Sequence, residues 1–170
     1  TVLSRGLGDV YKRQINYYSN PTSAKRIADL NKFKAIWRDI AERFKDYPET
    51  LLFEVFNEPY FWLSANEIST ISSDIINIVR TSGSNNESRK IIITGGDTNS
   101  WEVIFQIPND LINSDPNLIA TFHYYQPMSF TSSMQENNNN FNLSQNAKNQ
   151  ITQRFSPVSY THLTLPTSPK

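Results

Sequence analysis

The residues best suited to chemistry in this sequence are polar side chains that follow short apolar runs. They are Asn57, Glu58, Asp97, His123 and Tyr125. A carboxylic acid such as Glu58 can donate and accept a proton, and an amide, an imidazole and a phenol can support it by hydrogen bonding. The chain has no cysteine and two histidines, which excludes thiolate chemistry and disfavours a metal site. This pattern therefore favours acid/base chemistry, and no cofactor is implied.

Three short apolar runs are typical of buried strands. The sequence predicts strands near residues 51–57 (LLFEVFN), 90–95 (KIIITG) and 118–124 (LIATFHY). Each is bounded by residues that favour turns, and each precedes one of the polar positions named above.

Helical patterns separate these strands. Apolar residues recur at steps of three and four before the first strand and again before the second. The first stripe comprises Leu30, Phe33, Trp37, Ile40 and Phe44; the second comprises Ile68, Ile71, Ile75, Ile78 and Val79. Ser64 and Glu67 form a capping-box pattern that predicts the start of the second helix, and Gly83 predicts its end.

The remainder of the chain is less regular. The sequence predicts a short helix from about Ser100, a loop marked by Pro108 and Asp115-Pro116, and a final helix on Ala147, Ile151 and Phe155. Alternating strands and helices argue for an α/β fold with a parallel sheet. A doubly wound open sheet and part of a (β/α)8 TIM barrel both fit, although no strand is followed by a glycine-rich phosphate loop. In a barrel, catalytic residues lie at the carboxyl ends of the strands, where the polar residues cluster here.

Several linked segments resemble glycoside hydrolase family 5, the family of cellulase-type endoglucanases. ETLLFEVFNEP resembles the Asn-Glu-Pro signature, HYYQPMSFT resembles the later His-x-Tyr strand end, and IIITGGDTNSW resembles the strand between them. The resemblance extends over nearly all of residues 15–155, in the order of the family. It implies that the three strands are approximately the fourth to sixth of a (β/α)8 barrel.

The resemblance also implies roles for individual residues. Glu58 matches the acid/base that protonates the leaving group, and Asn57 matches the asparagine that binds the sugar 2-hydroxyl. His123 and Tyr125 match the His-x-Tyr pair that lines the cleaved-sugar subsite. Alternation along a strand would place His123 and Tyr125 on one side, and all four side chains are expected to converge.

Neighbouring residues receive different interpretations. Tyr60 and Trp62 follow the motif and could either stack on sugar rings or pack the loop. Trp101 is expected to pack its helix. Glu54, four residues before Glu58, should point the same way in a strand, and we interpret it as a buried carboxylate with a partner rather than as a catalyst.

The sequence departs from the family in one important respect. A retaining glycosidase needs a second carboxylate about 5 Å from the first, and in this family that nucleophile ends the seventh strand. After His123 the sole acidic residue is Glu136, in an Asn/Gln-rich stretch. The nucleophile is therefore expected to be missing, and the 170-residue chain is expected to be an internal fragment that does not hydrolyse β-glucan by itself.

Both ends look foreign to the rest. Residues 2–14 (VLSRGLGDVYKRQ) and 157–167 (PVSYTHLTLPT) resemble translated sequencing-library adapters. We therefore expect non-native ends at 1–14 and 157–170 and a partial glycoside hydrolase catalytic domain at 15–156. Sixteen basic and sixteen acidic residues balance over the whole chain, which disfavours a nucleic-acid partner, and no apolar run reaches the length of a membrane span.

The favoured function is a retaining endo-β-1,4-glucanase acting on β-glucan or a related plant polysaccharide, secreted and monomeric when complete. Three alternatives stay open. A β-mannanase or a mixed-linkage or xyloglucan-specific β-glucanase belongs to the same class. A non-catalytic carbohydrate-binding barrel and a metal-dependent barrel hydrolase belong to other classes.

Overall fold

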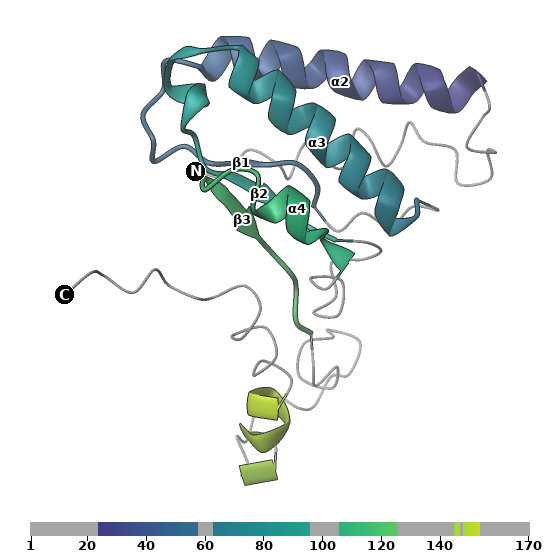
Figure 1. Cartoon of the computed structure of the whole chain (residues 1–170), viewed down its shortest axis with the longest axis vertical. Helices are drawn as coiled ribbons and strands as arrows, with labels where there is room; N and C mark the ends of the chain where they lie inside the picture. The colour runs from purple at the N-terminus through teal and green to yellow at the C-terminus, as the bar shows by residue number, and fades with distance from the viewer. Residues whose placement is uncertain (1–23, 58–62, 96–105, 126–144, 147, 154–170) are drawn as a thin grey trace, which may run out of the picture. The chain divides into compact units, whose positions relative to one another are not determined.

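A computed structural model describes residues 24–57, 63–95, 106–125, 145–146 and 148–153. The chain divides into two compact units, residues 1–123 and residues 124–170. The first unit carries the sheet and its helices (Figure 1). In the second unit, the described residues are Tyr124, Tyr125 and helical residues 145–146 and 148–153. Of the predicted final helix, Ile151 is helical, whereas Ala147 and Phe155 lie outside the described residues.

Three short parallel strands form the sheet in the order β1-β2-β3. They are β1 (Phe53–Glu54), β2 (Ile91–Ile93) and β3 (Leu118–Ala120). Phe53 is in register with Ile91, and Ile91 is in register with Leu118. The predicted strands and their parallel pairing are confirmed, although each strand is shorter than the apolar run that predicted it.

Helix α2 (Ala24–Phe44) begins several residues before the predicted stripe. Its buried line consists of Phe33, Trp37 and Ala41, at steps of four. The indole of Trp37 meets the ring of Phe53 edge-on, with centroids 5.7 Å apart, so that α2 packs directly on β1. The predicted helix is therefore confirmed. Of the predicted stripe, Phe33 and Trp37 are buried, whereas Leu30, Ile40 and Phe44 are partly exposed.

Helix α3 (Ala65–Thr81) begins at the predicted capping box. The Ser64 hydroxyl accepts a hydrogen bond from the backbone N–H of Glu67, and the Glu67 carboxylate accepts one from the backbone N–H of Ser64 at 2.8 Å. At the other end Gly83 adopts φ +77°, a left-handed conformation that glycine reaches without strain. A 3-10 turn, η1 (Ser84–Glu87), then leads toward β2.

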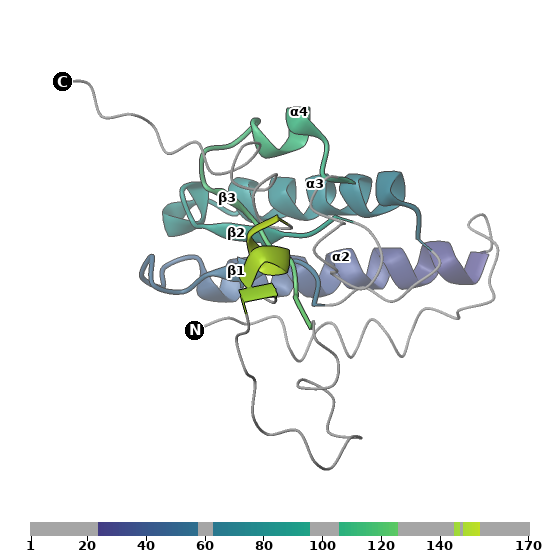
Figure 2. The ribbon, with the colours of Figure 1, turned by 90° about the horizontal axis from the view of Figure 1, so that it is seen from below.

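Helices α2 and α3 lie side by side on one face of the sheet, as both Figure 1 and Figure 2 show. Two ion pairs connect them, Arg26–Glu67 at 2.7 Å and Lys34–Asp74 at 2.6 Å. Between the helices and the sheet lies an apolar core. Its members include Phe33, Trp37, Phe53, Ile68, Ile75, Val79, Ile91 and Ile93.

Helix α4 (Asn109–Ile112) corrects the prediction of a loop after Pro108. The Pro108 carbonyl accepts from the N–H of Ile112 at 3.1 Å, which closes a single helical turn. None of its residues is buried, so no apolar stripe revealed this helix in the sequence.

Candidate active site

Asn57 lies where the chain leaves the first strand at its carboxyl end. The N–H of Val55 donates to the Ile92 carbonyl at 3.0 Å, so pairing with β2 continues one residue beyond Glu54. Asn57 follows two residues later and is partly exposed. The carboxyl ends of parallel strands meet at one edge of a sheet, so this is the edge where a barrel keeps its catalytic groups.

A bend at Val55 changes the direction of the side chains before Asn57. The Phe56 ring stacks on Phe33 of α2, with centroids 5.5 Å apart and planes within 9°. Phe53 and Phe56 thus both face α2, whereas strict alternation would put them on opposite faces. Because Glu58 lies outside the described residues, the expectation that Glu54 and Glu58 point the same way stays a prediction.

Glu54 is a buried carboxylate, 9% exposed, as the sequence predicted. Its neighbours in register are Ile92 of β2 and, one strand further, Ile119 of β3. Phe53 and its register partner Ile91 face the helices. Glu54, Ile92 and Ile119 therefore lie on the opposite face of the sheet, which in a barrel is the interior face.

The middle strand ends in a buried hydroxyl. Thr94 follows β2 directly and is 3% exposed. Within the part of the chain that the structure describes, its Oγ1 has no hydrogen-bond partner. The chemistry-bearing residue that the sequence indicated near this strand, Asp97, lies outside the described residues.

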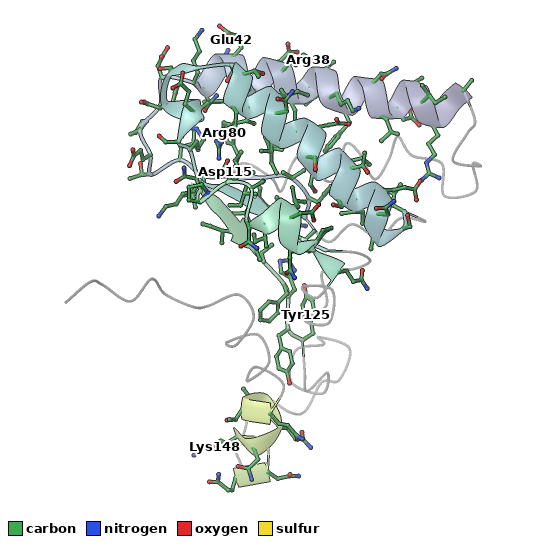
Figure 3. The ribbon with its side chains drawn as sticks, in the orientation of Figure 1. Arg38, Glu42, Arg80, Asp115, Tyr125 and Lys148 are labelled. Atoms are coloured by element: carbon green, nitrogen blue, oxygen red, sulfur yellow. The ribbon has the colours of Figure 1, made fainter. Side chains whose placement is uncertain are left out.

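His123 lies beyond the end of the third strand. The N–H of Thr121 donates to the Ile93 carbonyl at 2.9 Å, so β3 stays paired with β2 past Ala120. His123 follows and is partly buried. Tyr125 belongs to the second compact unit, where its side chain is 49% exposed and is drawn in Figure 3.

The remaining predicted site residues lie outside the described part of the structure. They are Glu58, Tyr60 and Trp62, together with Trp101 in the segment after β2. The convergence of Asn57, Glu58, His123 and Tyr125 therefore stays a prediction. Among the described residues, Asn57 and His123 follow the two outer strands of the same three-stranded sheet, β1 and β3, which β2 separates.

Arg89 supports the sheet from its opposite, amino end, and sequence reasoning missed it. Its side chain is 0% exposed, and its guanidinium lies 5.0 Å from the Phe53 ring centroid. It donates to four carbonyls between the end of α2 and the start of β1 and to the Asn86 side chain. These acceptors are Phe44 O (2.9 Å), Tyr47 O (2.8 Å), Pro48 O (3.1 Å), Leu51 O (2.7 Å) and Asn86 Oδ1 (2.5 Å).

The charge of Arg89 is stabilised by these carbonyl dipoles. Burial lowers its pKa, and the positive charge of Arg80 acts in the same direction. Arg80 in turn pairs with Asp115, which precedes β3, and the two side chains point toward one another in Figure 3 (Nε–Oδ2 2.6 Å). No local pattern marks Arg89, since arginine just before a strand is ordinarily exposed.

No group of three or more histidine, cysteine, aspartate or glutamate side chains is placed to hold a metal ion in the part of the chain that the structure describes. No helix among the same residues is both long and apolar enough to cross a membrane.

A parallel sheet with helices on one face, carrying an Asn-Glu pair after one strand and a histidine after another, is the arrangement of a barrel-type hydrolase. The family model for cellulase (glycosyl hydrolase family 5) matches residues 10–161. The chain belongs to this family, and its fold is part of a (β/α)8 barrel rather than a doubly wound sheet.

Curated relatives agree with the family. Endoglucanase H of Acetivibrio thermocellus is 43% identical over 103 residues, which cover 61% of this chain and 11% of that protein. Endoglucanase B of Ruminococcus albus is 36% identical over 124 residues, covering 65% and 29% respectively. The chain therefore spans less than a third of the length of these relatives.

Solved structures give the same result. A family 5, subfamily 4 endo-β-1,4-glucanase from Bacillus licheniformis, in complex with cellotetraose, superposes with a TM-score of 0.73 at 26% identity, covering 94% of this chain and 28% of that one. A family 5 xyloglucan-specific endo-β-1,4-glucanase from a metagenomic library, in complex with cellotriose, gives a TM-score of 0.63 at 33% identity, covering 84% and 44%.

Proposed function

We propose that the complete protein containing this chain is a retaining endo-β-1,4-glucanase, secreted and monomeric, that cleaves β-glucan. The observation that carries this proposal is the Asn57-Glu58 pair, which follows the carboxyl end of β1 in a chain that belongs to glycosyl hydrolase family 5. The relatives and similar structures named above, which are endoglucanases, support the same activity.

In this proposal Glu58 is the acid/base carboxylate. Cleavage of a β-glycoside needs a proton on the departing oxygen, and the same group then deprotonates the incoming water. Asn57 binds the sugar 2-hydroxyl, a contact that strengthens in the transition state. His123 and Tyr125 line the cleaved-sugar subsite, and Tyr60 and Trp62 stack on neighbouring sugar rings.

The nucleophile of the retaining reaction comes from outside these 170 residues. The sole acidic residue after His123 is Glu136, which does not follow a predicted strand. The glycosyl-enzyme intermediate therefore forms only in a complete barrel, and this chain alone does not turn over substrate.

The test is Glu58→Gln in a complete catalytic domain that contains this segment. Turnover of cellulose-type glucan should fall about 10²–10⁴-fold, the usual contribution of general acid/base catalysis. A nitrophenyl glycoside should lose less in the first step, because its leaving group needs little protonation, and azide should restore its turnover by attacking the intermediate.

Glu49→Gln is the matched control, since Glu49 is exposed before β1. This variant should keep full activity. Near-normal glucan turnover by Glu58→Gln would refute the assignment. A complete domain that binds β-glucan without cleaving it would instead identify a non-catalytic carbohydrate-binding barrel.

A second candidate substrate is favoured by one comparison. A structure that is 33% identical to this chain belongs to a xyloglucan-specific enzyme. Comparing initial rates on carboxymethyl cellulose, xyloglucan, mixed-linkage glucan and mannan would separate the main proposal from these alternatives. Exclusive cleavage of xyloglucan would replace cellulose-type glucan as the substrate.

A further inference from the structure

The sequence carries an acceptor motif for N-linked glycosylation at Asn86-Glu87-Ser88. The motif is Asn-x-Ser/Thr with any residue except proline in the middle, and a glycan on a folded protein requires its asparagine to be at the surface. Asn86 is instead 0% exposed. Ser88, which completes the motif, is exposed, so the motif crosses from the core to the surface.

The side chain of Asn86 is fully used inside the protein. Its Nδ2 donates to the Ala41 carbonyl and to the Ser82 hydroxyl, both at 2.8 Å. Its Oδ1 accepts from Arg89 Nε at 2.5 Å. Both amide hydrogens are therefore engaged. Three neighbours thus form with it the Asn86 cluster, which consists of Ala41, Ser82, Asn86 and Arg89.

A glycan on Asn86 Nδ2 is incompatible with this cluster. The bond to the sugar replaces one of the two amide hydrogens, so either Ala41 or Ser82 loses its donor. The sugar also needs space at a residue that has no exposed surface, and burying its hydroxyl groups without partners is costly. The modified asparagine and the native fold therefore exclude each other.

Asn86 is nevertheless accessible before the fold is complete. Its backbone carbonyl accepts from Arg80 Nη1 at 2.6 Å, and Arg80 is itself held by Asp115 at 2.6 Å, as Figure 3 lets the reader follow. Asp115 and strand β3, which pairs with β2, both come after the motif in the chain. Synthesis proceeds from the N-terminus, so the motif emerges before the residues that complete its surroundings.

We propose that Asn86 is an N-glycosylation site of the unfolded chain alone, and that its modification blocks folding. The donor is a lipid diphosphate-linked oligosaccharide of the kind that eukaryotic secretory pathways supply. The bond from the first sugar carbon to the diphosphate breaks, and a bond from that carbon to Asn86 Nδ2 forms. The lipid diphosphate leaves, and the amide gives up one proton. This inference does not depend on the role of Glu58.

The test secretes the complete catalytic domain from a eukaryotic host. Every version carries Asn142→Gln, because Asn142-Leu143-Ser144 is the other acceptor motif of this chain. Enzymatic deglycosylation converts a modified asparagine to aspartate, so peptide mapping then reads the occupancy of Asn86. Chains retained in the cell should carry a glycan on Asn86, and the secreted, active enzyme should carry none there.

Two substitutions of Ser88 separate the modification from the fold. Ser88→Ala removes the motif and leaves the Asn86 cluster intact, so the secreted yield should rise above that of the parent. Ser88→Thr is the matched control, because it changes the same exposed residue and keeps the motif, and it should bring no rise. In a bacterial cytoplasm, where this transfer does not occur, the three versions should give equal yields. If Ser88→Ala does not fold there, Ser88→Asn carries the same test.

A glycan on Asn86 in the secreted, active enzyme would overturn the inference, because the fold would then accommodate it. Unmodified Asn86 in both fractions would also overturn it, since folding would then be faster than the transfer. Equal secreted yields for Ser88→Ala and Ser88→Thr would show that the modification does not limit folding.

Discussion

Replacing Arg89 by methionine should remove a large part of the stability of the sheet. Methionine has a similar length and remains compatible with a buried site, but it carries no donor. The substitution leaves four backbone carbonyls and the Asn86 amide oxygen without the guanidinium that now binds them. It also removes the cation–π contact with Phe53.

The magnitude follows from how many of these acceptors can recover a partner. An unsatisfied buried acceptor costs about 1–3 kcal/mol. Arg89 is fully buried, and the bonds to Leu51 O and Asn86 Oδ1 are themselves buried. If water reaches the other acceptors but not these two, the free energy of unfolding falls by about 2–6 kcal/mol. Domains of this kind have about 5–15 kcal/mol in total.

Urea unfolding of the complete catalytic domain measures the effect. With a slope near 2 kcal/mol/M, the midpoint should fall by about 2 M. The midpoint of Arg89→Lys should fall less than that of Arg89→Met, because lysine keeps the positive charge and three hydrogen-bond donors. Arg38→Met is the control, since Arg38 is exposed on α2, and it should change stability by less than about 0.5 kcal/mol. Equal midpoints for Arg89→Met and Arg38→Met would refute the argument that Arg89 holds the connection into β1.

Two further substitutions test the helices, both by urea unfolding. Ser64→Ala should lower the free energy of unfolding by about 1 kcal/mol, because the α3 capping box loses its hydroxyl. A change below about 0.3 kcal/mol would show that the cap contributes little to stability. Asp74→Asn should cost less than about 1 kcal/mol, because the Lys34–Asp74 pair is 28% and 43% exposed, and that cost should shrink in about 0.5 M salt. If Asp74→Asn lowered the free energy of unfolding by more than this, independently of salt, the Lys34–Asp74 pair would stabilise the fold more than its exposure indicates.

Features encoded within a few residues were predictable from the sequence. The start of α3 depends on Ser64 and Glu67, which are three residues apart, and its end depends on Gly83. The apolar runs identified three parallel strands, because buried strands need continuous apolar sequence. The family motif located Asn57 and His123 after the first and third strands, where the structure has them.

Features that depend on distant partners were not predictable. Phe56 turns toward α2 because the ring of Phe33, far away in sequence, offers a stacking surface there. Arg89 is buried because carbonyls from the end of α2 and the following connection surround it. Helix α4 has no buried face, so periodicity could not reveal it. The mutual geometry of the four proposed catalytic residues stays a prediction.

The carboxylate of Glu67 fixes where α3 begins. One oxygen accepts from the backbone N–H and hydroxyl of Ser64, both at 2.8 Å, and the other accepts from Arg26 of α2 at 2.7 Å. Starting the helix one residue earlier or later would rotate this carboxylate about 100° away from Arg26. A change of sequence before Ser64 should therefore leave the register of α3 against α2 unchanged, so the two helices stay aligned whatever precedes the cap.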